Sequence, residues 1–290
     1  MARTHAPACY RELGAELRKR REAAGVTGVE LADRTGWTQT KISRIESGHL
    51  PVSTVDLLIY LGFCEIYRGQ ALDVLAMCRA AERVHGYWLN PHEPGLEDTL
   101  CSLIYHESTA SGSLSYEPEI VPGLLQTESY IRAMIADRWP HLEPDAAVRV
   151  RLERQQVLHR PRPRPFTFFI NENAFRLEIG DAAIMHEQLL ALTLLDTLPH
   201  ITIRVIPASV RVGGAFRMFT FTEHLPLVYL DTYGGGIFLE DNEYVNSYRE
   251  LIPALALAAL DEGESREFVA ALAYDHDRGS AHDRVEEKQL

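Results

Sequence analysis

The chain has 290 residues, of which 46% are hydrophobic, and this supply of apolar side chains excludes general disorder. No apolar run approaches the roughly 20 residues of a membrane-spanning helix, and the first ten residues lack an apolar signal core. We therefore expect a cytoplasmic protein with no membrane partner. The net charge is −12, yet residues 1–50 carry nine basic and six acidic side chains, a balance of +3, against −15 for the remainder. A basic N-terminal part on an acidic body favours a separate nucleic-acid-binding segment, although a solvated basic helix gives the same balance.

Short helices separated by capping residues and glycines are expected over the first 85 residues. Gly25 ends the first helix, and Thr27 and Ser53 are typical N-caps of later ones. Two prolines and a glycine in "LNPHEPG" (89–95) predict a domain boundary. The expected helices cover residues 10–24, 27–34, 38–47, 54–63 and 67–85.

The remainder mixes strands with clustered helices, which is typical of an α+β domain. Strands are expected in "SLSYE", "FTFFI", "ITIRVIP", "FRMFTF", "PLVYLDT" and "GIFLE", and helices over residues 96–111, 127–138, 144–159, 181–198, 242–260 and 264–273. The fold class is thus a mainly α N-terminal domain plus an α+β C-terminal domain. We expect a helical domain at 10–65, a helical linker at 66–95, the α+β domain at 96–275 and a disordered tail at 276–290.

The helix expected over residues 38–47 has two different faces. Ile42 and Ile45 lie three residues apart on one face, and Trp37 can staple against Ile42 if Thr38 is the N-cap. Polar side chains gather on the other face, where arginine could read guanine and glutamine adenine in a major groove. An ordinary amphipathic helix with a solvated outer face is the alternative. The preceding helix and glycine turn complete the spacing of a helix-turn-helix. The candidate base-contacting residues are Gln39, Thr40, Ser43 and Arg44.

The segment "LGAELRKRREAAGVTGVELADRTGWTQTKISRIESGHLPVS" resembles the lambda-repressor/Cro-like helix-turn-helix family, also called the xenobiotic response element family. The resemblance covers about residues 10–65 and implies double-stranded DNA as a partner. Because one helix-turn-helix reads only a few base pairs, we expect a homodimer on DNA. The resemblance also implies a structural ion pair between Arg21 and Glu46. A polar residue of the family that touches phosphate is replaced by Gly28, whose backbone amide could serve an anion instead. The candidate phosphate-contacting residues are Thr38, Lys41, Gly28 and Ser47.

The body resembles a domain that follows helix-turn-helix modules in actinobacterial regulators, including WhiJ-like and antitoxin-like proteins. The motifs that carry this resemblance include "EPEIVPGLLQTESYIRAMI", "RVRLERQQVLHR" and "IMHEQLLALT". It implies a small modulating partner protein. In "VPGLLQT" the candidate partner or pocket residues are Pro122, Gly123, Leu124 and Leu125, with packing inside the domain as the alternative.

Enzymatic motifs are weak in this sequence. "HEQLL" (186–190) has leucine where the zinc-protease motif needs a second histidine, so Leu189, Leu190 and Leu194 predict a core helix. We expect no catalytic residues, no metal and no cofactor. The sequence therefore favours a DNA-binding transcriptional regulator whose body binds a small partner protein. A regulator that senses a small molecule is the alternative, and an enzyme with a DNA-binding module is a more remote one.

Overall fold

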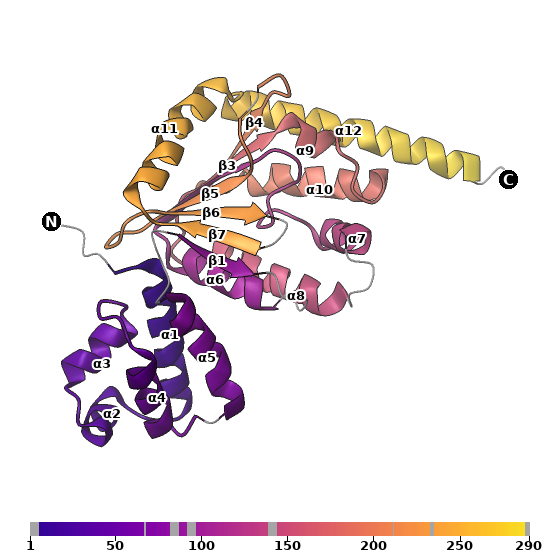
Figure 1. The fold of residues 1–290 in the computed structure, drawn as a ribbon. Helices are drawn as coiled ribbons and strands as arrows, with labels where there is room; N and C mark the ends of the chain where they lie inside the picture. Colours follow the sequence, from indigo (N-terminus) through magenta and orange to yellow (C-terminus); the bar gives the residue numbers. More distant parts are fainter. Residues whose placement is uncertain are drawn as a thin grey trace. The chain divides into compact units, whose positions relative to one another are not determined.

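The structure is a computed structural model that describes residues 6–66, 68–81, 87–91, 97–138, 144–210, 212–232 and 235–287. The chain divides into two compact units (Figure 1). The first consists of Met1–Pro91 and Thr220–Val245, and the second of His92–Phe219 and Asn246–Leu290. A helical N-terminal region followed by a mixed α and β region confirms the predicted fold class. No helix among these described ranges is long and apolar enough to cross a membrane.

The first unit is built on a helical head whose helices begin where the sequence predicts caps. Thr27, Thr38 and Ser53 each accept a hydrogen bond from a backbone amide three residues later, which satisfies a donor that the helix itself leaves free. The helices are α1 (Ala8–Ala23), α2 (Gly28–Thr35), α3 (Gln39–Glu46), α4 (Thr54–Phe63) and α5 (Arg68–Ala81).

Helix α5 differs from the linker expected over residues 66–95. Its buried side chains Ala71, Val74 and Cys78 join the same apolar core as Leu13 and Leu17 of α1. The head therefore extends at least to Ala81, because the four preceding helices leave an apolar surface that α5 covers. The expected boundary at 89–95 overlaps a strand, β1 (Tyr87–Pro91), and residues 92–96 lie outside the described residues.

Residues 220–245 belong to the first unit, although the sequence assigns them to a continuous body. Strands β6 (Leu227–Thr232) and β7 (Gly235–Leu239) pair antiparallel, and β7 also pairs antiparallel with β1. The same segment contacts α1: Glu240 accepts a hydrogen bond from the Ala8 amide at 2.6 Å, and the Arg11 guanidinium lies 4.5 Å from the Phe221 ring centre. These pairings join segments far apart in sequence, which local patterns cannot reveal.

The second unit contains a sheet with strand order β5-β2-β3-β4, in which β2, β3 and β4 run parallel. Parallel neighbours require crossover connections, and the intervening helices supply them. Its elements are α6 (Glu97–Thr109), β2 (Gly112–Glu117), α7 (Glu128–Arg138), α8 (Pro144–Gln155), the 3-10 turn η1 (Gln156–His159), β3 (Phe166–Asn171), α9 (Glu172–Arg176), α10 (Ala182–Leu195), β4 (Ile201–Ile206), β5 (Phe216–Thr220), α11 (Asn242–Ala258) and α12 (Glu262–Glu287).

Two expectations for the second unit are wrong. The chain from 276 to 287 continues α12 instead of being disordered, since Val269 and Ala273 anchor earlier turns in the core and no proline interrupts propagation. In α10, Leu189 is buried, but Leu190 and Leu194 are exposed, because only one side of the helix packs on the core.

Candidate nucleic-acid interface

The helix-turn-helix is formed by α2, a short turn and α3, and its local geometry follows from four residues. Thr27 and Glu30 form a reciprocal capping box at the start of α2. Gly36 ends α2 with φ 71°, a left-handed conformation that suits glycine. Thr38 then caps α3 by accepting the Lys41 amide. These caps set where α3 begins and therefore which of its side chains turn outward.

Helix α3 is held by its apolar face and by close backbone contact with α1. Ile42 and Ile45 are buried in the head core, and Trp37 packs against the same core. Gly14 in α1 allows the approach, because a Cβ there would collide with the backbone carbonyls of Ile45 and Glu46. A glycine inside a predicted helix is the sequence signal for such close contact.

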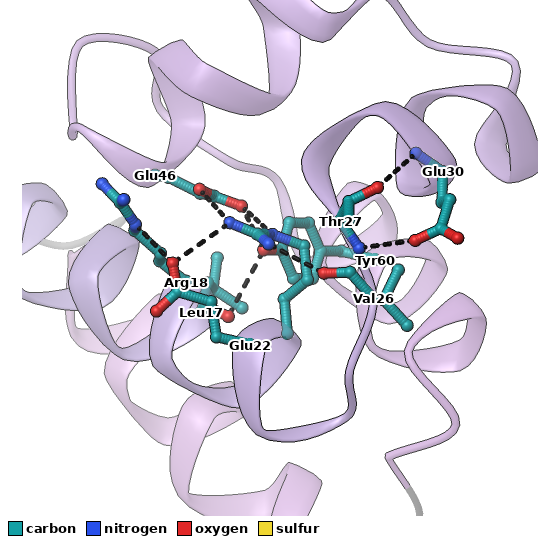
Figure 2. Close-up of polar contacts among 9 residues, drawn as sticks. Leu17, Arg18, Glu22, Val26, Thr27, Glu30, Glu46 and Tyr60 are labelled. Carbon is teal, nitrogen blue, oxygen red and sulfur yellow. Dashed lines mark hydrogen bonds and ion pairs between the residues drawn. The ribbon is translucent and has the colours of Figure 1, made fainter.

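A buried polar network fixes the end of α3 to α1 and α4 (Figure 2). Arg21 donates two hydrogen bonds to Glu46, at 2.6 Å and 2.9 Å, and a third to the Val26 carbonyl at 2.8 Å. The Tyr60 hydroxyl donates to the same Glu46 carboxylate at 2.6 Å. The Arg21 and Glu46 side chains are only 8% and 9% exposed. The structure thus contains the ion pair that the family resemblance implies, with Tyr60 as an additional partner.

The network also shifts proton affinities. The hydrogen bond to Glu46 raises the pKa of Arg21, so its guanidinium stays charged. Burial, followed by the hydrogen bond to Glu46, raises the pKa of Tyr60, which keeps the phenol neutral as a donor. Burial raises the pKa of the Cys64 thiol to about 11. At neutral pH Arg21 is therefore charged, and the Tyr60 phenol and the neighbouring Cys64 thiol are neutral.

The outer face of α3 presents hydrogen-bonding side chains to solvent. Its exposed members are Gln39, Thr40, Ser43 and Arg44. Among the described ranges, the Arg44 guanidinium forms no ion pair. This surface combines an amide, hydroxyls and one guanidinium, and such groups can match the donors and acceptors of base-pair edges.

The residues expected to touch phosphate occupy different environments. Lys41 Nζ lies 3.1 Å from Asp56 Oδ2 and 3.7 Å from the Trp37 ring centre, so its charge is partly neutralised within the head. Thr38 and Ser47 are exposed at the two ends of α3. Gly28 is half-buried in the first turn of α2, where the carboxylate of Glu30 already lies near the helix N-terminus.

The candidate partner residues of the "VPGLLQT" segment lie in the second unit. Leu124 and Leu125 are buried in its main apolar core, and Pro122 is buried as well. Gly123 is half-buried and lies against the Arg154 guanidinium, while its carbonyl accepts a hydrogen bond from Gln155. These leucines therefore pack inside the unit, the alternative that the sequence left open.

A buried ionic cluster in the second unit was missed by the sequence analysis. The Glu107 carboxylate receives hydrogen bonds from Arg154 at 2.6 and 2.7 Å and from Arg217 at 2.5 Å. Glu117 lies 3.7 Å from Arg217. The four residues come from α6, β2, α8 and β5, so only the tertiary fold brings them together. The residues that the structure describes contain no group of three or more His, Cys, Asp or Glu side chains that could hold a metal.

Comparisons with known proteins also separate the helical head from the rest of the chain, although they place residues 220–245 with the second part, whereas the structure groups these residues with the first unit. A family model described as "Helix-turn-helix domain" matches residues 12–80, which includes α5. A second model, described as "Domain of unknown function (DUF5753)", matches residues 100–271. A comparison with curated proteins finds no match.

Proposed function

The chain belongs to the DUF5753 family and carries a helix-turn-helix domain in front of it, and from this premise we propose that it is a sequence-specific transcriptional regulator of the xenobiotic response element type. Gln39, Thr40, Ser43 and Arg44 read base edges in the major groove. Thr38, Ser47 and the Gly28 amide contact the phosphate backbone, with Lys41 beside them.

The exposed polar face of α3 carries this proposal, because the rest of that helix is fully committed to the head. Its isoleucines lie in the core, and Glu46 accepts hydrogen bonds from Arg21 and Tyr60. These contacts fix the position of α3 and therefore the orientation of its exposed polar face. Preorganised side chains lose less conformational freedom when they bind.

Selection of bound duplexes from a random pool by the full-length chain tests the proposal. A conserved consensus with two inverted half-sites about one helical turn apart is expected, because a homodimer would read both halves. Recovery of unselected sequences would refute sequence-specific reading.

For the body we propose binding of a small modulating protein, as in antitoxin-like systems, without enzymatic activity. Its support is the family resemblance together with the exposed Leu190 and Leu194 on α10, which offer apolar contact area. The purified complex, captured with a tag on the chain and analysed by mass spectrometry, should contain a stoichiometric small protein. If the chain instead purifies without a partner protein, and its affinity for DNA changes when a small molecule is added, the small-molecule-sensing regulator would be favoured.

A further inference from the structure

Helix α4 is apolar on both sides, unlike a helix that merely lies at a protein surface. Its inner side consists of Leu57, Tyr60 and Leu61, which are buried in the head core. The outer side should therefore be polar if water were its only neighbour. The outer side of α1 shows that pattern, with Arg18, Lys19 and Glu22 exposed.

The outer side of α4 has the opposite character. Val55 is 67% exposed, Leu58 50% and Phe63 42%. Val55, Leu58, Ile59 and Gly62 follow the i, i+3, i+4, i+7 spacing of one helix face, and Ile59 is only half-buried. We call Val55, Leu58, Ile59, Gly62 and Phe63 the α4 face.

Charge and shape both suit this face to a copy of itself. The only charged residue of α4 is Asp56, and its carboxylate is already paired with Lys41 of the same head. Two such faces therefore bring no unpaired charge of α4 together, and the neighbouring Arg34 guanidinium lies at the end of the face, where it donates a hydrogen bond to the Phe63 carbonyl. A Cβ at Gly62 would meet no atom within 4 Å, so no contact inside the chain requires glycine there. Glycine also lowers helix stability, whereas it permits close approach of a second helix.

We propose that the α4 face is the contact between two heads bound to adjacent half-sites. The proposal rests on the proposed function, since two heads meet on one operator. The face is isologous, so each copy contributes the same residues. Stable interfaces use roughly 20–30 residues on each side, far more than this face offers. The contact therefore produces cooperativity on DNA, where the half-sites hold the heads together, and only weak pairing of the free chain.

Binding of the full-length chain to duplexes with one or two half-sites measures this contact. For the double variant Val55→Gln/Leu58→Gln, two-site affinity should fall at least about tenfold relative to wild type, with one-site affinity unchanged. Glutamine adds no charge that DNA would attract or repel. The matched control is Leu72→Gln on α5, because Leu72 is 60% exposed and lies outside the face. The control should retain wild-type cooperativity.

Gly62→Gln separates pairing from folding. The substitution should raise helix stability, because the site is open and glutamine is the better helix former, yet it should reduce cooperativity. Two outcomes would overturn the α4-face proposal and leave the proposed DNA-binding function intact. They are independent occupation of the two half-sites by the wild type, and unchanged cooperativity in the double variant. If no duplex were bound at all, the proposed function would fail. Sedimentation equilibrium of the free chain would then test the α4 face without DNA. Self-association that the double variant loses would support the face, and self-association that the double variant retains would overturn it.

Discussion

Replacing Glu46 by alanine removes the acceptor on which three hydrogen bonds of the head converge. Two come from Arg21 and one from the Tyr60 hydroxyl. The guanidinium would keep its hydrogen bond to the Val26 carbonyl and a longer contact of 3.7 Å with the Glu22 carboxylate, in a site where the Arg21 side chain is 8% exposed. The substitution therefore removes the hydrogen-bonded counter-ion of a buried positive charge and leaves only the more distant, exposed Glu22 carboxylate.

Removing one partner of a buried ion pair costs about 3–5 kcal/mol. Because Arg21 retains one carbonyl acceptor, the longer Glu22 contact and a little exposure, we expect the lower part of this range, about 3 kcal/mol. Arg21→Met combined with Glu46→Leu should be more stable than Glu46→Ala, since it strands no charge. The matched control is Arg18→Ala, which breaks the exposed pair with Glu22, leaves the Arg21 contacts in place and should change stability little.

Urea unfolding of the full-length chain measures these effects if Trp37 is the only fluorescent tryptophan. The chain has three tryptophans, so the other two would be replaced by phenylalanine. Trp37 packs against the head core and reports its unfolding directly. A loss below about 1 kcal/mol for Glu46→Ala, or one equal to that of Arg18→Ala, would refute the buried-network reasoning.

Three further predictions concern single side chains of the head. Arg44→Ala should cost about 1–3 kcal/mol per half-site and relax base preference at one or two positions, as measured by competition binding; an unchanged preference would remove Arg44 from the reading face. Lys41→Ala should weaken binding to all duplexes by the same factor. Asp56→Asn should strengthen binding to all duplexes, because it frees the Lys41 ammonium from its ion pair. A change that depends on the DNA sequence would contradict both expectations. Because the pKa of Tyr60 is raised on folding, its stabilising effect is complete below the unfolded value of about 10 and is lost as pH rises above it. Tyr60→Phe should therefore reduce the loss of head stability between about pH 9 and pH 11 in the urea assay, and an identical pH dependence would contradict this assignment.

The parts of the head that the sequence predicts are those set by local chemistry. Thr27, Thr38 and Ser53 cap the helices expected after them, because capping involves only residues three positions apart. The two isoleucines of α3 are buried for a similarly local reason, their spacing on one helical face.

Other features depend on segments that meet only in the folded chain. Lys41 was predicted as a phosphate contact, but its pairing with Asp56 follows from the packing of α4 on α3. Strand β1 was missed because Asn90 and Pro91 are typical of a loop, and β7, its partner, lies far along the chain. Leu189 and Leu190 are both leucine, yet only Leu189 is buried, so apolar residue type alone does not predict which side of α10 faces the core.

The measurement closest to the central claim is the specificity ratio of the full-length chain. Its affinity for the selected two-half-site duplex is divided by its affinity for a scrambled duplex of equal length, both at about 150 mM salt. Base reading by α3 predicts a ratio of at least about 10³, which should fall sharply when Gln39 and Arg44 are replaced by alanine. Equal affinities for the two duplexes, or a ratio unaffected by that double substitution, would contradict base reading by α3.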